Sequence, residues 1–289
     1  MPDPPPEPTR VEIAAATSGA GSLRIAIDRR RAVLGVAAAW IGIEILLLIL
    51  DYHLNYATPE LDDAIRRLTS LAREDSLADL VSVIQVVFLA VTLWAVYLTV
   101  RRRGGSRWQR AGWLTVACLF SYMAIDDGSA MHERVGTAVT HLLTAWSATS
   151  GSGFSFPSYT WQLVYLPWFA LFGAFTLCFL WAELRPKYSR LMVVAGLGCF
   201  VAAVGMDFAE GLDSGHVLNP YTRLADGFDL TAFTRGRFNA EPYDALLHFS
   251  KAFEETIEMF GTTLIWLAVL RHWLAGLDDV HIRVSSRPA

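Results

Sequence analysis

HFSKAFEETIEMFGTTLIWLAVLR, residues 248–271, is the stretch that decides the fold class. Met259 to Leu270 is an uncharged run, whereas the first half of the stretch carries several charges on what is expected to be the same helix. A bilayer core of roughly 30 Å needs about 20 apolar residues to cross it. A helix that spans here must therefore hold carboxylates inside the hydrocarbon, where ionisable side chains are costly and mark functional sites. The stretch predicts a membrane helix with a functional polar face.

The rest of the chain supports a membrane protein. Of its 289 residues, 53% are hydrophobic and 18% are charged, which is too apolar for an ordinary soluble domain. We expect an all-α, polytopic membrane protein with a six-helix transmembrane bundle. The helices are expected in the apolar runs at residues 32–50, 80–100, 111–130, 162–183, 191–210 and 249–270.

Arginine placement predicts the orientation. Basic residues precede the first run and fill two short connections, residues 101–110 and 185–190, which contain no acidic residue. Because cytoplasmic loops carry an excess of Lys and Arg, we expect both termini in the cytoplasm and a multi-pass protein of the cell (plasma or inner) membrane. A net charge of −4 without a basic stripe excludes nucleic acid as a partner.

Outside the helices, three segments carry expectations. Residues 1–22 are proline-rich and polar and are interpreted as a disordered cytoplasmic tail. Residues 23–275 form the transmembrane domain, and residues 276–289 form a second cytoplasmic tail. In the first outer loop, Thr58-Pro59-Glu60 has the signals of a helix start, followed by one apolar stripe. We expect a short helix there, lying on the outer interface or covering the outer mouth.

Carboxylates gather at one depth of the predicted bundle. At 1.5 Å per residue from each cytoplasmic arginine, four runs place acids in the outer third of the membrane: Glu44, Asp126, Asp127, Asp207, Glu254, Glu255 and Glu258. A second group comes near the outer surface: Asp51, His53, His132, Glu133, Glu210 and His248. Scattered surface charge would not select one layer.

The spacing groups these residues on helix faces. Asp126 and Glu133 are seven residues apart and share a face of the expected third helix. On the last helix, His248, Lys251 and Glu258 lie within one arc with the adjacent pair Glu254 and Glu255. The pattern therefore predicts one cluster between the helices.

So many carboxylates cannot all stay ionised in a low dielectric. A bound cation, protonation, or pairing with Lys251, Arg134 and the histidines would each resolve the conflict. A set that mixes His with Asp and Glu suits zinc, iron or manganese. We expect a divalent-metal site with Asp127 and Glu255 in catalytic roles and with the ligands Asp126, His132, Asp207, Glu210, His248, Glu254 and Glu258.

The acidic motifs also carry a resemblance. Asp126-Asp127-x4-His132-Glu133, Asp207-x2-Glu210 and Glu254-Glu255-x2-Glu258 resemble a group of uncharacterised bacterial multipass membrane proteins with an Asp-(Asp/Glu)…His-Glu motif. A looser analogy is to the ceramidase-like membrane hydrolases, which hold zinc with three histidines plus Ser and Asp. That analogy would give these roles to Asp127, Ser129, His132, His216 and His248, although the His-x-x-x-His of their last helix is absent here.

Two function classes follow. The first is a metal-dependent membrane enzyme, such as a hydrolase or oxidase, that acts on a lipid or small-molecule substrate from the outer side by metal-activated water. The second is a cation- or proton-coupled transporter, with a metal-binding sensor as a further alternative. Against transport stands the cytoplasmic half of the bundle, where the sequence shows little polar continuation of a path. The metal, the reaction and the oligomeric state stay open.

Overall fold

The computed structural model describes residues 11–14, 22–25, 28–57, 62–73, 75–150, 156–277 and 280–283. Ten α-helices lie in this part of the chain, and the prediction of an all-α fold is confirmed. The helices are α1 (Arg29–Tyr52, extended by a π-helical turn η1, His53–Ala57), α2 (Asp63–Thr69), α3 (Leu77–Arg102), α4 (Arg107–Asp127), α5 (Met131–Ser150), α6 (Thr160–Glu183), α7 (Lys187–Glu210), α8 (Pro220–Gly227), α9 (Thr231–Phe238) and α10 (Pro242–Gly276).

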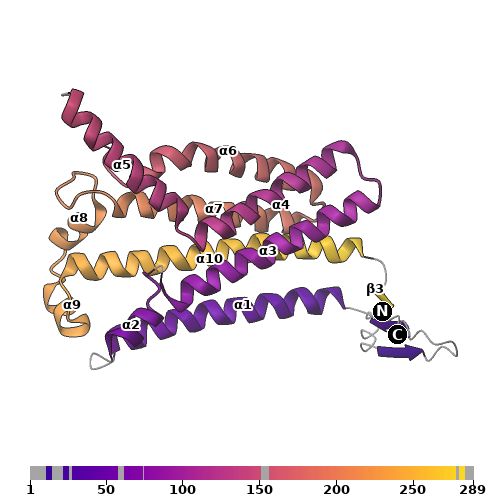
Figure 1. The fold of residues 1–289 in the computed structure, drawn as a ribbon. Coiled ribbons are helices and arrows are strands. Elements are labelled where there is room, and N and C mark those ends of the chain that lie inside the picture. Colours follow the sequence, from indigo (N-terminus) through magenta and orange to yellow (C-terminus); the bar gives the residue numbers. More distant parts are fainter. Residues whose placement is uncertain are drawn as a thin grey trace, which may run out of the picture.

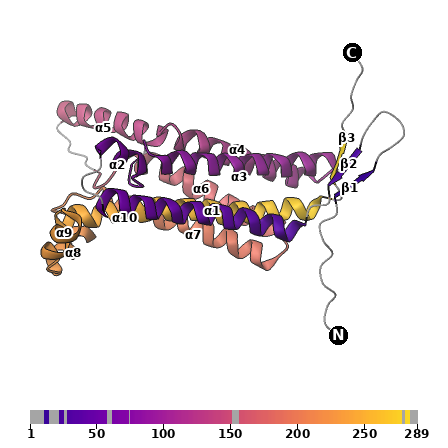
Figure 2. The ribbon, with the colours of Figure 1, turned by 90° about the horizontal axis from the view of Figure 1, so that it is seen from below.

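The long helices lie lengthwise beside one another (Figures 1 and 2). α10 is the central helix and packs against α1, α3 and α7, while α3 pairs with α4 and α6 pairs with α5 and α7. The α3–α4 and α6–α7 connections lie at one end of the bundle, and α2, α8 and α9 lie at the other (Figure 1). The two arginine-rich connections therefore lie at the same end of the bundle.

Four described helices are long and apolar enough to cross a membrane, namely the segments Arg29–Tyr56, Leu77–Arg102, Thr160–Glu183 and Lys187–Glu210. Many of their large apolar side chains face outward, including Val91 and Val201, the latter 74% exposed. Such extensive exposed apolar surface marks a contact with membrane or protein. This chain is a helical protein with candidate membrane spans.

The bundle core is built where α3, α4, α6 and α10 meet. Leu93, Trp113, Phe179 and Val269 are fully or almost fully buried there. Gly112 allows the contact between α4 and α6, because a Cβ at this position would overlap the ring of Phe179. Small residues at helix crossings are how membrane helices approach closely.

Three segments differ from the sequence-based expectations. The third predicted run does not continue to residue 130: α4 ends at Asp127, Ala130 adopts a left-handed φ of 46°, and α5 starts at Met131 as an additional helix. The Ser129 hydroxyl donates back to the Ile125 carbonyl at 2.6 Å, which helps to end the helix. Asp126 and Glu133 are thus on two helices, and the predicted shared face is wrong.

The connection between α1 and α3, expected as the first outer loop, does contain a short helix, α2, whose N-cap is Asp62. The expected start at Thr58-Pro59 lies outside the described residues. In the N-terminal stretch expected to be disordered, the structure instead has strand β1 (Val11–Ala14), which pairs with β2 (Ser22–Ile25), and β2 pairs with β3 (Val280–Arg283), all antiparallel. The alternating residues Val11-Glu12-Ile13 are typical of a strand, although a proline-rich stretch precedes them.

The crossing of α7 and α10 gives a testable prediction. A Cβ at Gly196 would lie 2.7 Å from the carbonyl oxygen of Gly261, so Gly196→Ala must push the two helices apart. We expect a loss of about 1–3 kcal/mol, measured as thermal unfolding in detergent. The matched control is Gly198→Ala, two residues along α7, where a Cβ meets nothing within 4 Å. Equal stability of the two variants would contradict the close crossing.

Candidate functional site

A half-buried lysine stands inside a group of carboxylates between α10 and α7. The Lys251 ammonium lies 3.2 Å from Glu254 Oε1, 3.7 Å from Glu255 Oε1 and 3.8 Å from Asp207 Oδ1. The Lys251 side chain is 21% exposed, and Asp207 and Glu254 are buried. Glu254 and Glu255 follow Lys251 by three and four residues, the spacing that brings side chains together on a helix. We call these four residues the lysine cluster.

α6 supplies polar partners to the acids of α7. The Gln162 amide donates to Asp207 Oδ2 at 2.7 Å, and the Tyr159 hydroxyl, just before α6, donates to Glu210 Oε1 at 3.3 Å. Within the described part of the chain, one oxygen each of Glu210 and Glu254 is buried without a hydrogen-bond partner. A buried acceptor without a partner is expensive, so these oxygens call for a proton or a cation.

A second pair forms at the break between α4 and α5. The buried Asp126 accepts hydrogen bonds from the His132 backbone N–H at 3.0 Å and lies 2.8 Å from the His132 Nδ1. The His132 ring packs edge-on against Trp161, with ring centroids 4.8 Å apart. The neighbouring Asp127 accepts from the Ser82 hydroxyl of α3 at 3.2 Å. The turn at residues 128–130 makes the Asp126–His132 pairing possible.

Near the end of the bundle, α1 and α10 hold a third pair. The His248 Nε2 lies 3.4 Å from the buried Asp51 Oδ2. Asp51 Oδ1 also accepts from the Leu71 backbone N–H and the Asn55 amide, both at 3.0 Å. Asp51 therefore ties the connection between α1 and α3 to α10 and helps to hold these segments in position.

Glu44 belongs to a polar group that the sequence analysis did not assemble. Its Oε1 accepts from the Gln85 amide at 3.0 Å and from the Thr263 hydroxyl at 2.6 Å, and all three side chains are buried. Two further hydrogen bonds join α3 to α10 toward the arginine-rich end: Trp266 to Thr92 at 2.9 Å and Trp273 to Thr99 at 3.4 Å. Gln85, Thr92 and Thr99 are spaced by seven residues on α3, a periodicity that could have been noticed.

Glu258 connects these groups electrostatically. It is half-buried on α10 and interacts through its charge with Glu254, Glu255, Asp127 and Lys251. Glu258 follows Glu254 by one helical turn on α10. That the acids of several helices form one functional site stays a prediction.

The predicted metal ligands do not converge on one point. Asp126 and His132 pair with each other, His248 pairs with Asp51, Glu254 and Asp207 face Lys251, and Glu210 faces Tyr159. Within the described residues, no group of three or more His, Cys, Asp or Glu is arranged to hold a metal ion. The three histidines of the hydrolase analogy are likewise apart, since the His216 Nδ1 accepts from the Leu218 N–H in the connection after α7. The metal site stays a prediction.

His132 gives a prediction on pH. Burial disfavours its charged form, but the hydrogen bond and the negative charge of Asp126 outweigh burial, so the pKa of His132 is raised above its usual 6.5. The stabilisation by this pair is complete below about pH 6.5, the ordinary pKa of histidine, and is lost as pH rises through the raised pKa. We expect the Tm difference between wild type and His132→Gln to shrink toward alkaline pH. His141→Gln, exposed on the same helix, should follow the wild-type curve; a pH-independent difference for His132→Gln would refute the pairing.

No curated protein and no solved structure matches the sequence. A family model described as a domain of unknown function, DUF8692, matches residues 32–273, from α1 to α10. The match takes in all the long helices and each of the polar pairs above. The chain therefore belongs to the DUF8692 family.

Proposed function

We propose that the protein spans the membrane six times, with both termini cytoplasmic, and acts as a proton- or cation-coupled carrier whose binding centre is the lysine cluster. The observation that supports this function is a lysine within 4 Å of three carboxylates from two helices. Among the described residues, one buried oxygen each of Glu210 and Glu254 has no hydrogen-bond partner. Ionisable chains of this kind inside membrane helices mark ion pathways and proton relays.

The support for six spans is the packing of the helices rather than their hydropathy. α4 and α10 carry too much polarity to count as apolar spans, yet α4 packs along α3 and α10 packs against α1, α3 and α7. A central helix meets protein on most sides and does not need the apolar surface of a lipid-facing one. If α3 and α7 cross the membrane, α4 and α10 cross with them.

The α3–α10 hydrogen bonds weaken the main objection to transport. Gln85 with Thr263, Thr92 with Trp266, and Thr99 with Trp273 place polar groups at successive depths toward the arginine-rich end. Such bonds also hold membrane helices together. They nevertheless provide the polar continuation through the inner half that a carrier requires.

A divalent-metal enzyme is the second candidate. Glu258 interacts through its charge with the neighbouring Glu254, Glu255 and Asp127, and a metal ion such as zinc, iron or manganese would relieve the repulsion among them. Elemental analysis of the purified protein separates the two functions. About one metal ion per chain in wild type, lost in Glu258→Gln, would favour the enzyme and would count against the carrier.

Lys251→Met tests the lysine cluster. Removing the ammonium takes the ion-pair partner away from the buried Glu254, and breaking a buried ion pair typically costs about 3–5 kcal/mol. Lys187→Met changes the only other lysine of the chain, exposed at the start of α7, and should alter stability by less than about 0.5 kcal/mol. Adding Glu254→Gln to Lys251→Met should restore part of the loss, as a double-mutant cycle of unfolding temperatures would measure. No recovery would show that the two residues act independently.

Transport itself is tested in proteoliposomes that hold a pH-sensitive dye and an imposed pH gradient. Wild type should collapse the gradient faster when sodium or potassium is added, and Lys187→Met should do the same. Glu254→Gln and Lys251→Met should both be inactive, because each removes one partner of the central pair. A wild-type protein that leaves the gradient unchanged with both ions would contradict the carrier.

The orientation is tested by thiol labelling in a background without Cys118, Cys178 and Cys199. A cysteine at the exposed Gly236 of α9 should react with an impermeant reagent on intact cells. A cysteine at Tyr188, 69% exposed at the start of α7, should react only after permeabilisation because positive connections stay inside. The reverse pattern would place the lysine cluster nearer the cytoplasm.

A further inference from the structure

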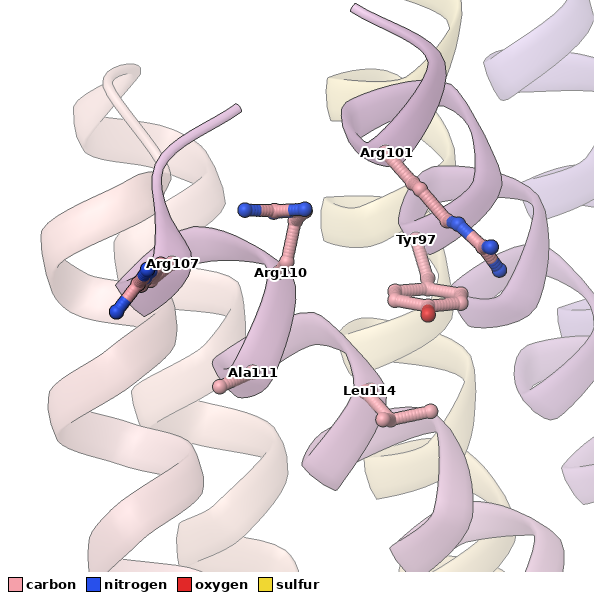
Figure 3. Close-up of a pocket in the computed structure, with 6 residues that line it drawn as sticks. All are labelled: Tyr97, Arg101, Arg107, Arg110, Ala111 and Leu114. Atoms are coloured by element: carbon pink, nitrogen blue, oxygen red, sulfur yellow. The ribbon is translucent and has the colours of Figure 1, made fainter. Parts of the chain in front are cut away.

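The α3–α4 hairpin ends in an open hollow that carries three arginines. The hollow has a volume of about 410 Å³ and is lined by Tyr97, Arg101, Arg107, Arg110, Ala111 and Leu114 (Figure 3). Tyr97 and Arg101 come from the last turns of α3, and the other four come from the first turns of α4. The size falls within the range of about 300–1,000 Å³ that is usual for small-ligand sites.

The three guanidinium groups have no acidic partner in the part of the chain that the structure describes. Two exposed arginines elsewhere do have one: Arg67 lies 2.9 Å from Asp75, and Arg235 lies 2.8 Å from Glu241. On the neighbouring α6, Glu183 accepts a hydrogen bond from the Gln109 amide at 3.1 Å. Like charges that line one hollow repel one another, so an anion placed between them is stabilised.

The hollow lies where a membrane surface is expected. Arg101 is at the end of a candidate span, Leu77–Arg102, and the exposed Trp108 follows in the first turn of α4. At the same end of the bundle, the Arg190 guanidinium lies 5.3 Å from the ring centroid of Trp181. Tryptophan and arginine side chains of this kind are enriched at the level of the lipid headgroups.

Along α3 and α4, away from the arginine-rich connection, the helix faces that carry the arginines become apolar. Leu114 and Cys118 lie one and two turns from Arg110 on α4, and Cys118 is exposed. On α3, the exposed Leu98 lies one turn from Arg101. A ligand with an anionic head and an apolar chain therefore matches the surface along its length.

From this arrangement we propose that the hollow binds the phosphate group of an anionic phospholipid, with the acyl chains against α3 and α4. The planar guanidinium groups of Arg101, Arg107 and Arg110 donate paired hydrogen bonds to phosphate oxygens. Basic pockets between membrane helices are suited to such headgroups. The inference rests on the proposed membrane embedding and is independent of transport.

The experiment uses the full chain purified in detergent and titrated with phosphatidylglycerol or phosphatidylcholine. Bound lipid is counted by native mass spectrometry, and the Tm is followed in parallel. The test variant carries Arg101→Gln, Arg107→Gln and Arg110→Gln. The control variant carries Arg30→Gln, Arg102→Gln and Arg185→Gln, which removes the same charge from exposed arginines at the same end of the bundle.

Wild type and the control should prefer phosphatidylglycerol, and the test variant should lose at least about tenfold in affinity for it, since each basic residue near an anionic surface contributes severalfold. Arg110→Lys, which keeps the charge but not the paired donors, should lose less than the triple change. Equal losses in the two triple variants would overturn the site in favour of diffuse attraction. Unchanged binding by the test variant would overturn it as well.

Two further arms identify the source of the phosphate and the dependence on the membrane. Inorganic phosphate that displaces phosphatidylglycerol as effectively as added lipid does would reassign the hollow to a soluble anion and overturn the proposal. Wild type that leaves the membrane fraction in alkaline carbonate would refute the embedding itself. A failure confined to the lipid titration, with the protein retained in membranes, would refute only the lipid site.

Discussion

The ion pairs of Lys251 are the interaction on which the arrangement of the bundle depends. α10 is the central helix, and its polar half faces α7, where Asp207 adds another acid. Without the ammonium at this point, the helix would bring several carboxylates into a poorly solvated interior. With it, the same residues hold α7 and α10 at a fixed rotation. The glycines at positions 196 and 261 then allow the backbones to approach.

The sequence predicts the helices well because the membrane imposes a simple rule on length and polarity. Each of the six expected runs falls on a long helix of the structure, with ends that differ by up to seven residues. The largest error concerns α5. Its sequence, from Met131 to Ser150, contains several Thr, His and Ser residues. These polar residues lower the mean hydropathy, so a search for apolar runs does not predict this helix. A left-handed residue at Ala130 has no strong local signal, so the break before α5 could not be read from the chain.

The candidate site was predictable in composition but not in pairing. One-dimensional depth brings Asp126, Asp207 and Glu254 to one layer, and the structure puts each of them in a buried polar group. Depth along a helix does not tell which side chain faces which. Gln85 and Gln162, the uncharged partners of Glu44 and Asp207, were missed because only ionisable residues were considered. Amide and hydroxyl groups donate hydrogen bonds to several of these carboxylates, so a metal ion is not needed to satisfy all of their oxygens.

The three hydrogen bonds between α3 and α10 bear on how this bundle can move. The bonds join Gln85 to Thr263, Thr92 to Trp266 and Thr99 to Trp273. The residue numbers of the partners rise together along both helices, so α3 and α10 run parallel, and the bonds lie at different heights of one interface. An axial slide of one helix would stretch all three bonds simultaneously. The three bonds together therefore resist sliding of α3 along α10 more than any single bond would, and the two helices are expected to move as one rigid unit. Large rearrangements, where they occur, must take the form of rotation of other helices about this unit.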